Sequence, residues 1–161
     1  MKYVIDTNVT VAANGRDTHA NPQCQFRCIE FLLEVTIPTN MKQITVDESG
    51  LILNEYSRYL SFKGQPGVGD MFFKFVHDNM YSSKKISSVR ITPITDETRG
   101  FEELPMNQID KSDRMFLAVA IKANADVINA LDTDWHEQHA FIASLDITVQ
   151  QLCPEHGVKV I

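Results

Sequence analysis

The stretch Lys111-Ser-Asp-Arg-Met-Phe-Leu-Ala-Val-Ala-Ile-Lys-Ala-Asn124, followed by Asp126-Val-Ile-Asn129, decides the fold class of this chain. Its apolar side chains first recur at the spacing of one helix face and then form the short apolar run of a buried strand. The same alternation predicts further strands at 2–5, 44–46, 89–91 and 147–149. It predicts further helices at 22–35, from Asp47 or Ser49 to about 59, and at 71–81, 95–104 and 135–145. Strands that alternate with helices predict a three-layer α/β/α sandwich with a central, mainly parallel sheet.

Composition sets further limits on the protein. The 161 residues, 43% hydrophobic and 22% charged, predict one domain over 1–161 and no membrane span. The net charge of -6 excludes binding of nucleic acid through overall positive charge, but it does not exclude an enzyme that acts on nucleic acid. Three cysteines, an odd number, argue against a disulfide framework and favour a reducing, cytoplasmic location. Cys24 and Cys28 share a helix face without further zinc ligands near them in sequence, which predicts core positions.

Acidic residues fall where the predicted strands end or the next helices begin. Asp6 ends the first strand, Asp113 lies in the first turn of the helix 111–124, and Asp132 follows the strand 126–129. In a parallel α/β sheet, ligands bind outside the carboxyl ends of the strands. Hard divalent cations take oxygen ligands, and clustered carboxylates without a cation would repel one another. Together the acids predict a metal site, although helix capping or a turn accounts for Asp113 or Asp132 taken singly.

Five segments resemble, in the same order, the motifs of the PIN domain, the nuclease fold of VapC-type toxins of toxin–antitoxin pairs. They are Tyr3-Val-Ile-Asp-Thr-Asn-Val, Ser49-Gly-Leu-Ile-Leu-Asn-Glu55, Asp113-Arg-Met-Phe-Leu-Ala-Val-Ala120, Asn124-Ala-Asp-Val-Ile-Asn-Ala-Leu-Asp-Thr-Asp-Trp135 and Ile147-Thr-Val-Gln-Gln-Leu-Cys-Pro-Glu155. The family usually has Thr or Ser where this chain has Ala130. That departure implies either reduced activity or a substitute role for Asn129.

The resemblance implies hydrolysis of RNA phosphodiester bonds with one or two Mg²⁺ or Mn²⁺ ions. The implied catalytic and metal-binding residues are Asp6, Glu55, Asp113, Asp132 and Asp134, with Asn8 orienting Asp6 or a water. Candidate phosphate contacts are Arg16, Arg58, Lys84 and Lys85. The partners implied are RNA, an antitoxin protein and a second copy of the chain in a homodimer.

Two other functions remain open at this point. A haloacid-dehalogenase-like phosphatase would use Asp6 as its nucleophile, but that family has a second acid where Asn8 stands. A PIN-like scaffold without catalysis would bind RNA or a partner protein, and Ala130 would then mark lost activity.

Overall fold

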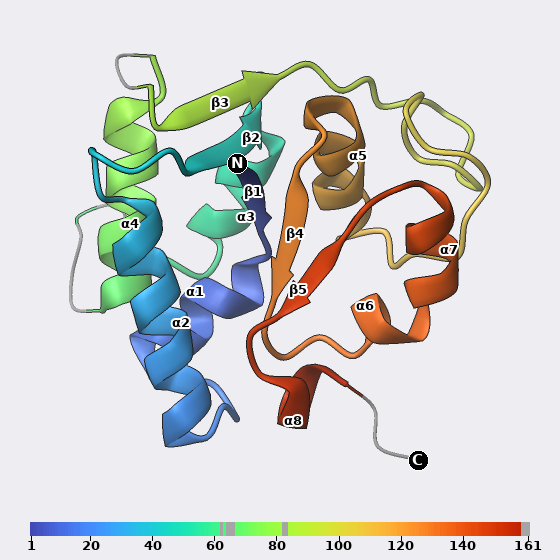
Figure 1. Cartoon of the computed structure of the whole chain (residues 1–161). Coiled ribbons are helices and arrows are strands. Elements are labelled where there is room, and N and C mark those ends of the chain that lie inside the picture. Colours follow the sequence, from blue (N-terminus) through green and yellow to red (C-terminus); the bar gives the residue numbers. More distant parts are fainter. Residues whose placement is uncertain (62, 64–66, 82–83, 159–161) are drawn as a thin grey trace.

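Five parallel strands form the centre of the computed structural model, which describes residues 1–61, 63, 67–81 and 84–158 (Figure 1). The strands are β1 (Lys2–Ile5), β2 (Gln43–Asp47), β3 (Ile86–Val89), β4 (Asp126–Asn129) and β5 (Val149–Gln151). They pair in the order β3-β2-β1-β4-β5, and every pairing is parallel. The predicted parallel α/β sheet is confirmed.

Helices cover both faces of this sheet. They are α1 (Thr7–Asn14), α2 (Pro22–Val35), α3 (Leu51–Ser57), α4 (Val68–Asn79), α5 (Arg114–Ala123), α6 (Asp134–Glu137), α7 (His139–Ser144) and α8 (Pro154–Gly157). From β1 the chain passes through β2 to β3 at one edge of the sheet, and it then crosses to β4 and β5 at the other edge. Because these crossovers are right-handed, α1, α2 and α4 lie on one face of the sheet and α5 lies on the other (Figure 1). In the described part of the chain, no helix has the length and apolar character needed to cross a membrane.

The strand order reverses between β1 and β4, and this reversal places the site. Val4, Ile5, Val127 and Ile128 are fully buried, as expected for parallel strands covered on both faces. Their chains leave the sheet in opposite directions at its carboxyl edge, where a crevice opens in folds of this kind. Asp6 follows β1 directly, so its carboxylate lies at that crevice.

Several predicted boundaries are wrong. Residues 95–104 form turns around an antiparallel bridge between Pro93 and Phe101, because Gly100 adopts a positive φ that ends any helix there. The strand expected at 89–91 is β3, which begins at Ile86 because its register follows β2. The strand expected at 147–149 is β5, and the helix expected over 135–145 is divided at Gln138 into α6 and α7. Helix α1 was not predicted.

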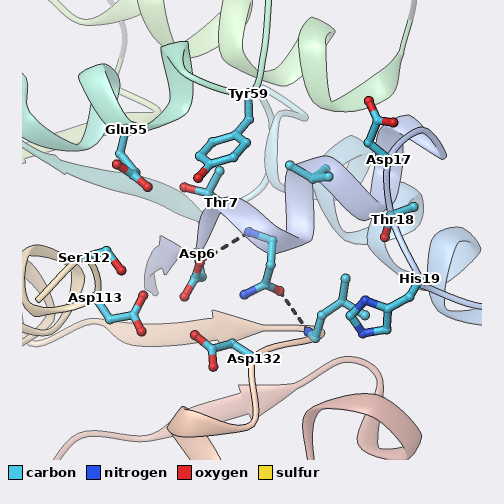
Figure 2. A pocket seen from close by; sticks show the side chains of 13 residues that line it. Asp6, Thr7, Asp17, Thr18, His19, Glu55, Tyr59, Ser112, Asp113 and Asp132 are labelled. Atoms are coloured by element: carbon cyan, nitrogen blue, oxygen red, sulfur yellow. Dashed lines mark hydrogen bonds between the residues drawn. The ribbon is translucent and has the colours of Figure 1, made fainter. Parts of the chain in front are cut away.

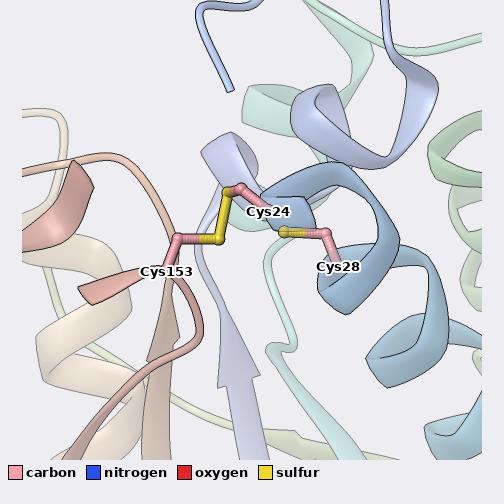
Figure 3. A group of neighbouring side chains, drawn as sticks. All are labelled: Cys24, Cys28 and Cys153. Carbon is pink, nitrogen blue, oxygen red and sulfur yellow. A yellow bond between two sulfur atoms is a disulfide. The ribbon is translucent and has the colours of Figure 1, made fainter. Parts of the chain in front are cut away.

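The cysteines also correct an expectation. Cys24 on α2 and Cys153 before α8 form a disulfide, and Cys28 remains a free thiol beside them (Figure 3). The odd number of cysteines therefore argued wrongly against a disulfide, since one pair and one free thiol also make three. All three are buried, as predicted for Cys24 and Cys28, and burial raises the pKa of Cys28 to about 12. The disulfide fastens the segment after β5 to α2.

A candidate metal centre at the carboxyl edge of the sheet

A pocket of about 390 Å³ lies at the carboxyl ends of β1 and β4. Four of the predicted site acids line it: Asp6, Glu55, Asp113 and Asp132. Figure 2 shows the Asp6, Asp113 and Asp132 side chains directed toward one another, with Glu55 across the pocket from them. Residues separated by more than 120 positions in sequence thus meet in one place, as the metal-site prediction required.

Asp6 is held by hydrogen bonds on both of its carboxylate oxygens. Its Oδ1 accepts from the backbone N–H of Asn8 at 3.3 Å, because Asp6 is the N-cap of α1. Its Oδ2 accepts from the indole Nε1–H of Trp135 at 2.6 Å. Asp6 is only 5% exposed, and Trp135 is buried beside it. These two donors fix the direction in which the carboxylate faces the pocket.

Asp113 and Asp132 complete a compact group of carboxylates. One oxygen from each of Asp6, Asp113 and Asp132 lies within 4.8 Å of the others. Asp113 is buried at the N-cap position of α5, where its side chain makes no capping hydrogen bond. The helix-capping explanation of Asp113 therefore does not hold, and its carboxylate faces the other acids instead.

The electrostatics of this group favour the binding of a cation. Burial raises the pKa of Asp6 to about 6, with the charges of Asp132 and Glu55 adding to the effect. Burial, and then the charges of Asp6 and Asp132, raise the pKa of Asp113 to about 9. Three oxygen donors that disfavour one another's negative charge at this separation are a set that fits a hard divalent cation.

These shifts predict how the stability of the metal-free protein depends on pH. Asp113 has a folded-state pKa above its unfolded value, so between about pH 4 and pH 9 the folded state holds a proton that the unfolded state releases. Stability should therefore fall as pH rises through this window. Thermal unfolding in chelator at pH 5 to 9 would measure it, with Asp113→Asn as a reference that flattens the curve. A wild-type melting temperature that does not fall more steeply than that of Asp113→Asn would contradict the prediction.

Glu55 reaches the pocket because α3 is anchored at both ends. The buried Asp47 carboxylate accepts from the backbone N–H groups of Leu51 and Ile52, at 2.9 and 2.8 Å. The Tyr56 hydroxyl donates to the carbonyl of Ile5 at 2.5 Å, which ties α3 to the end of β1. Glu55 lines the pocket but does not belong to the group of three carboxylates within 4.8 Å.

Asp134 lies in a second group of acids that shares one member with the first. Oxygens of Asp110, Asp113 and Asp134 lie within 4.8 Å of one another. The backbone N–H of Asp134 donates to Asp132 Oδ1 at 2.9 Å, so the turn predicted for this segment also exists. Burial and then the Asp132 charge raise the pKa of Asp134. Asp134 is therefore beside the pocket rather than in its lining.

The predicted basic residues are not gathered at the pocket. Arg16 forms an ion pair with the buried Asp70 at 2.9 Å, and Arg58 approaches Glu55 at 3.7 Å. Lys84 and Lys85 line a different pocket, together with Met1 and the 38–43 segment. Lys85 directly precedes β3, and so it lies at the amino edge of the sheet. Their contact with phosphate stays a prediction.

Sequence reasoning missed several residues at the site. Trp135 was quoted only as part of a motif, and its role as a donor to Asp6 depends on folding across 129 positions. Asn129 was considered only as a substitute for the hydroxyl absent at Ala130, although its place at the end of β4, like that of Asp6 after β1, was a signal for a wider role. His19 and Tyr59 also line the pocket, from the α1–α2 loop and from just after α3 (Figure 2). Neither lies in a motif that the sequence analysis singled out.

A solved structure resembles this chain at low sequence identity. No protein-family model matches the sequence. No curated protein matches it either. The structure is similar to that of a chain from VapBC2 of Rickettsia felis, whose crystal structure was determined bound to a DNA fragment from their promoter, with a TM-score of 0.45, 13% identity, and coverage of 94% of this chain and 98% of that chain.

Proposed function

We propose that this protein is a metal-dependent ribonuclease that hydrolyses RNA phosphodiester bonds with Mg²⁺ or Mn²⁺. The observation that carries the proposal is the meeting of the Asp6, Asp113 and Asp132 carboxylates within 4.8 Å at the switch point of the sheet. The raised pKa values of Asp6 and Asp113 support a cation there, and the ordered motifs that resemble the PIN domain support RNA as the substrate. One ion would bind if Asp134 is not a ligand, and a second ion could bind if Asp134 is a ligand as well.

The residues of the chain would divide the work as follows. Asp6, Asp113 and Asp132 would hold the cation, and the indole N–H of Trp135 and the backbone N–H of Asn8 would keep Asp6 turned toward it. A divalent ion at this place supplies charge neutralisation for the phosphate and activation of a water for attack on phosphorus. Glu55, across the pocket, is the carboxylate that orients this water or accepts its proton. No covalent intermediate with the protein is needed.

The same resemblance supports the partners. We propose an antitoxin protein and a second copy of this chain as partners. The cytoplasm also stays a proposal, although the Cys24–Cys153 disulfide removes the cysteine argument that favoured it. Arg16 and Arg58 remain candidate phosphate contacts. Arg58 has the stronger support, since it approaches the pocket residue Glu55. Lys84 and Lys85 would contact only a more distant part of a long RNA.

The phosphatase alternative loses support from the state of Asn8. Asn8 Oδ1 accepts from the backbone N–H groups of Ala130 and Leu131, at 3.0 and 2.9 Å. Its Nδ2 donates to Asn129. An amide committed in this way does not replace the second acid that an aspartyl-phosphate mechanism needs beside Asp6. The PIN-like scaffold without catalysis remains an outcome of the test.

The test is cleavage of single-stranded RNA by the purified protein with Mn²⁺, with Mg²⁺ and with EDTA. We expect cleavage with either ion and none with EDTA, with activity restored by added Mn²⁺. An Asp6→Asn protein prepared in the same way controls for contaminating ribonuclease. RNA binding without cleavage and without Mn²⁺ uptake would contradict the proposal and favour the scaffold.

A further inference from the structure

The Asn129 side chain is buried at the end of β4, and all of its hydrogen-bonding capacity is used. Its Oδ1 accepts from Asn8 Nδ2 at 2.9 Å and from the backbone N–H of Asp132 at 3.2 Å. Its Nδ2 donates to the backbone carbonyl of Asp132 at 2.8 Å and to Gln151 Oε1 at 2.7 Å. A primary amide has two donor hydrogens and two acceptor lone pairs, so nothing is left for a ligand.

The side-chain amide of Asn129 therefore forms hydrogen bonds with both the backbone N–H and the backbone carbonyl of Asp132. Asn8 holds the two residues before it, since its Oδ1 accepts from the N–H groups of Ala130 and Leu131. Every backbone N–H from Ala130 to Asp132 thus donates to one of two asparagine side chains. The loop that carries the Asp132 carboxylate into the pocket is fixed by these two amides.

Gln151 and Gly157 close the outer side of this network. Gln151, on β5, accepts from Asn129, and Gly157 packs directly against both. A Cβ atom on Gly157 would lie 2.5 Å from Gln151 Oε1 and 2.9 Å from the Ala130 carbonyl oxygen. The Cys24–Cys153 disulfide fastens the chain between Gln151 and Gly157 to α2. Only glycine fits at this place without displacing the amides.

We propose that Asn129 is a positioning residue for the metal centre, which acts by fixing the Asp132 backbone and, through Gln151, by tying it to the segment around Gly157. The inference rests on the proposed function, since Asp132 is a proposed metal ligand. The inference also bears on Ala130, where the PIN family usually has a hydroxyl. With the side chain of Asn129 completely engaged and fully buried, Asn129 does not replace a hydroxyl that would touch water or phosphate. Asn129 instead holds the backbone of the loop 130–132 in place.

The test measures Mn²⁺ affinity by calorimetry for Asn129→Ser and Gln151→Met. Loss of a group that orients a metal ligand typically weakens metal binding by roughly 10–100-fold, which we expect for Asn129→Ser. Gln151→Met removes one acceptor one step further away, so we expect a loss of about fivefold. The RNA KM should stay unchanged while kcat at limiting Mn²⁺ falls, because Asn129 does not reach the substrate. Gly157→Ala should act in the same direction, because its Cβ would displace the amides although it replaces none of their side chains.

Gln150→Met is the matched control, because Gln150 also lies on β5 and its side chain donates a hydrogen bond of 2.9 Å to Asp126. This hydrogen bond lies away from the pocket. Gln150→Met should leave Mn²⁺ affinity unchanged. A metal-independent readout is amide hydrogen exchange in EDTA, which should quicken at Asp132 in Asn129→Ser. Mn²⁺ affinity within twofold of wild type in both Asn129→Ser and Gln151→Met, or a changed RNA KM with unchanged Mn²⁺ affinity, would overturn this inference alone. A wild-type protein that binds no Mn²⁺ would overturn the proposed function and this inference with it.

Discussion

Replacing Asp113 with Asn should lower the rate of Mn²⁺-dependent RNA cleavage by about 1,000-fold, because a metal centre contributes several kcal/mol to transition-state stabilisation and each 1.36 kcal/mol is tenfold in rate. The same variant should be more stable than the wild type when no metal is present. Near pH 8 folding of the wild type is coupled to proton uptake at Asp113, whose pKa is raised to about 9, and this uptake costs free energy. Asn has no such requirement.

The opposite signs of these two effects identify a site built for a cation. Thermal unfolding in EDTA at pH 8 should give a melting temperature for Asp113→Asn above that of the wild type, at roughly 2–4 °C for each kcal/mol of repulsion removed. Asp126→Asn is the control, because Asp126 lies at the other end of β4 and binds Gln150. An Asp113→Asn protein that keeps wild-type cleavage, or that is less stable than the wild type in EDTA, would count against the account.

Trp135→Phe should weaken Mn²⁺ binding by roughly 10–100-fold while leaving the fold intact. Phe retains most of the buried ring but has no N–H, so the change removes the 2.6 Å hydrogen bond to Asp6 Oδ2 and little else. The Asp6 carboxylate, already disfavoured by burial, then loses a donor that lowers its pKa. Calorimetric titration of both proteins with Mn²⁺ measures the difference.

Tyr3→Phe provides a matched control for the loss of one donor. Tyr3 is also buried and lies on β1, and its hydroxyl contacts Met1 Sδ at 3.7 Å, at the opposite end of the strand from Asp6. Trp135 is the single tryptophan of the chain, so the fluorescence of the wild type should change when Mn²⁺ binds beside Asp6. Equal Mn²⁺ affinities of Trp135→Phe and wild type would show that the indole N–H has no part in holding Asp6.

The carboxylate group was predictable because it depends on a rule about strand ends. Asp6 and Asp132 follow strands that could be recognised by their apolar runs, and the carboxyl ends of parallel strands share one edge. Sequence alone did not reveal that β1 and β4 are neighbours, which is what brings these two acids to within 4.8 Å. Strand order is set by packing over the whole chain, and local periodicity carries little information about it.

The errors have the same origin. Helix α1 escaped prediction because its polar residues, such as Asn8 and Asn14, resemble a turn, and its stability comes from the Asp6 cap and from packing on α2 and α4. The partner of Cys24 lies 129 positions away, so its disulfide could not be inferred from spacing. Two partners of Asn129, the side chains of Asn8 and Gln151, are likewise distant in sequence and became visible only in the folded chain.

The most direct measurement of the central claim is a crystal structure of the wild-type protein grown with Mn²⁺, with anomalous data that locate the ion. The account predicts an anomalous peak in contact with carboxylate oxygens of Asp6, Asp113 and Asp132 at the carboxyl edge of the sheet. An ordered set of these three side chains with no peak between them, at a Mn²⁺ concentration that supports full occupancy elsewhere or in solution, would contradict it.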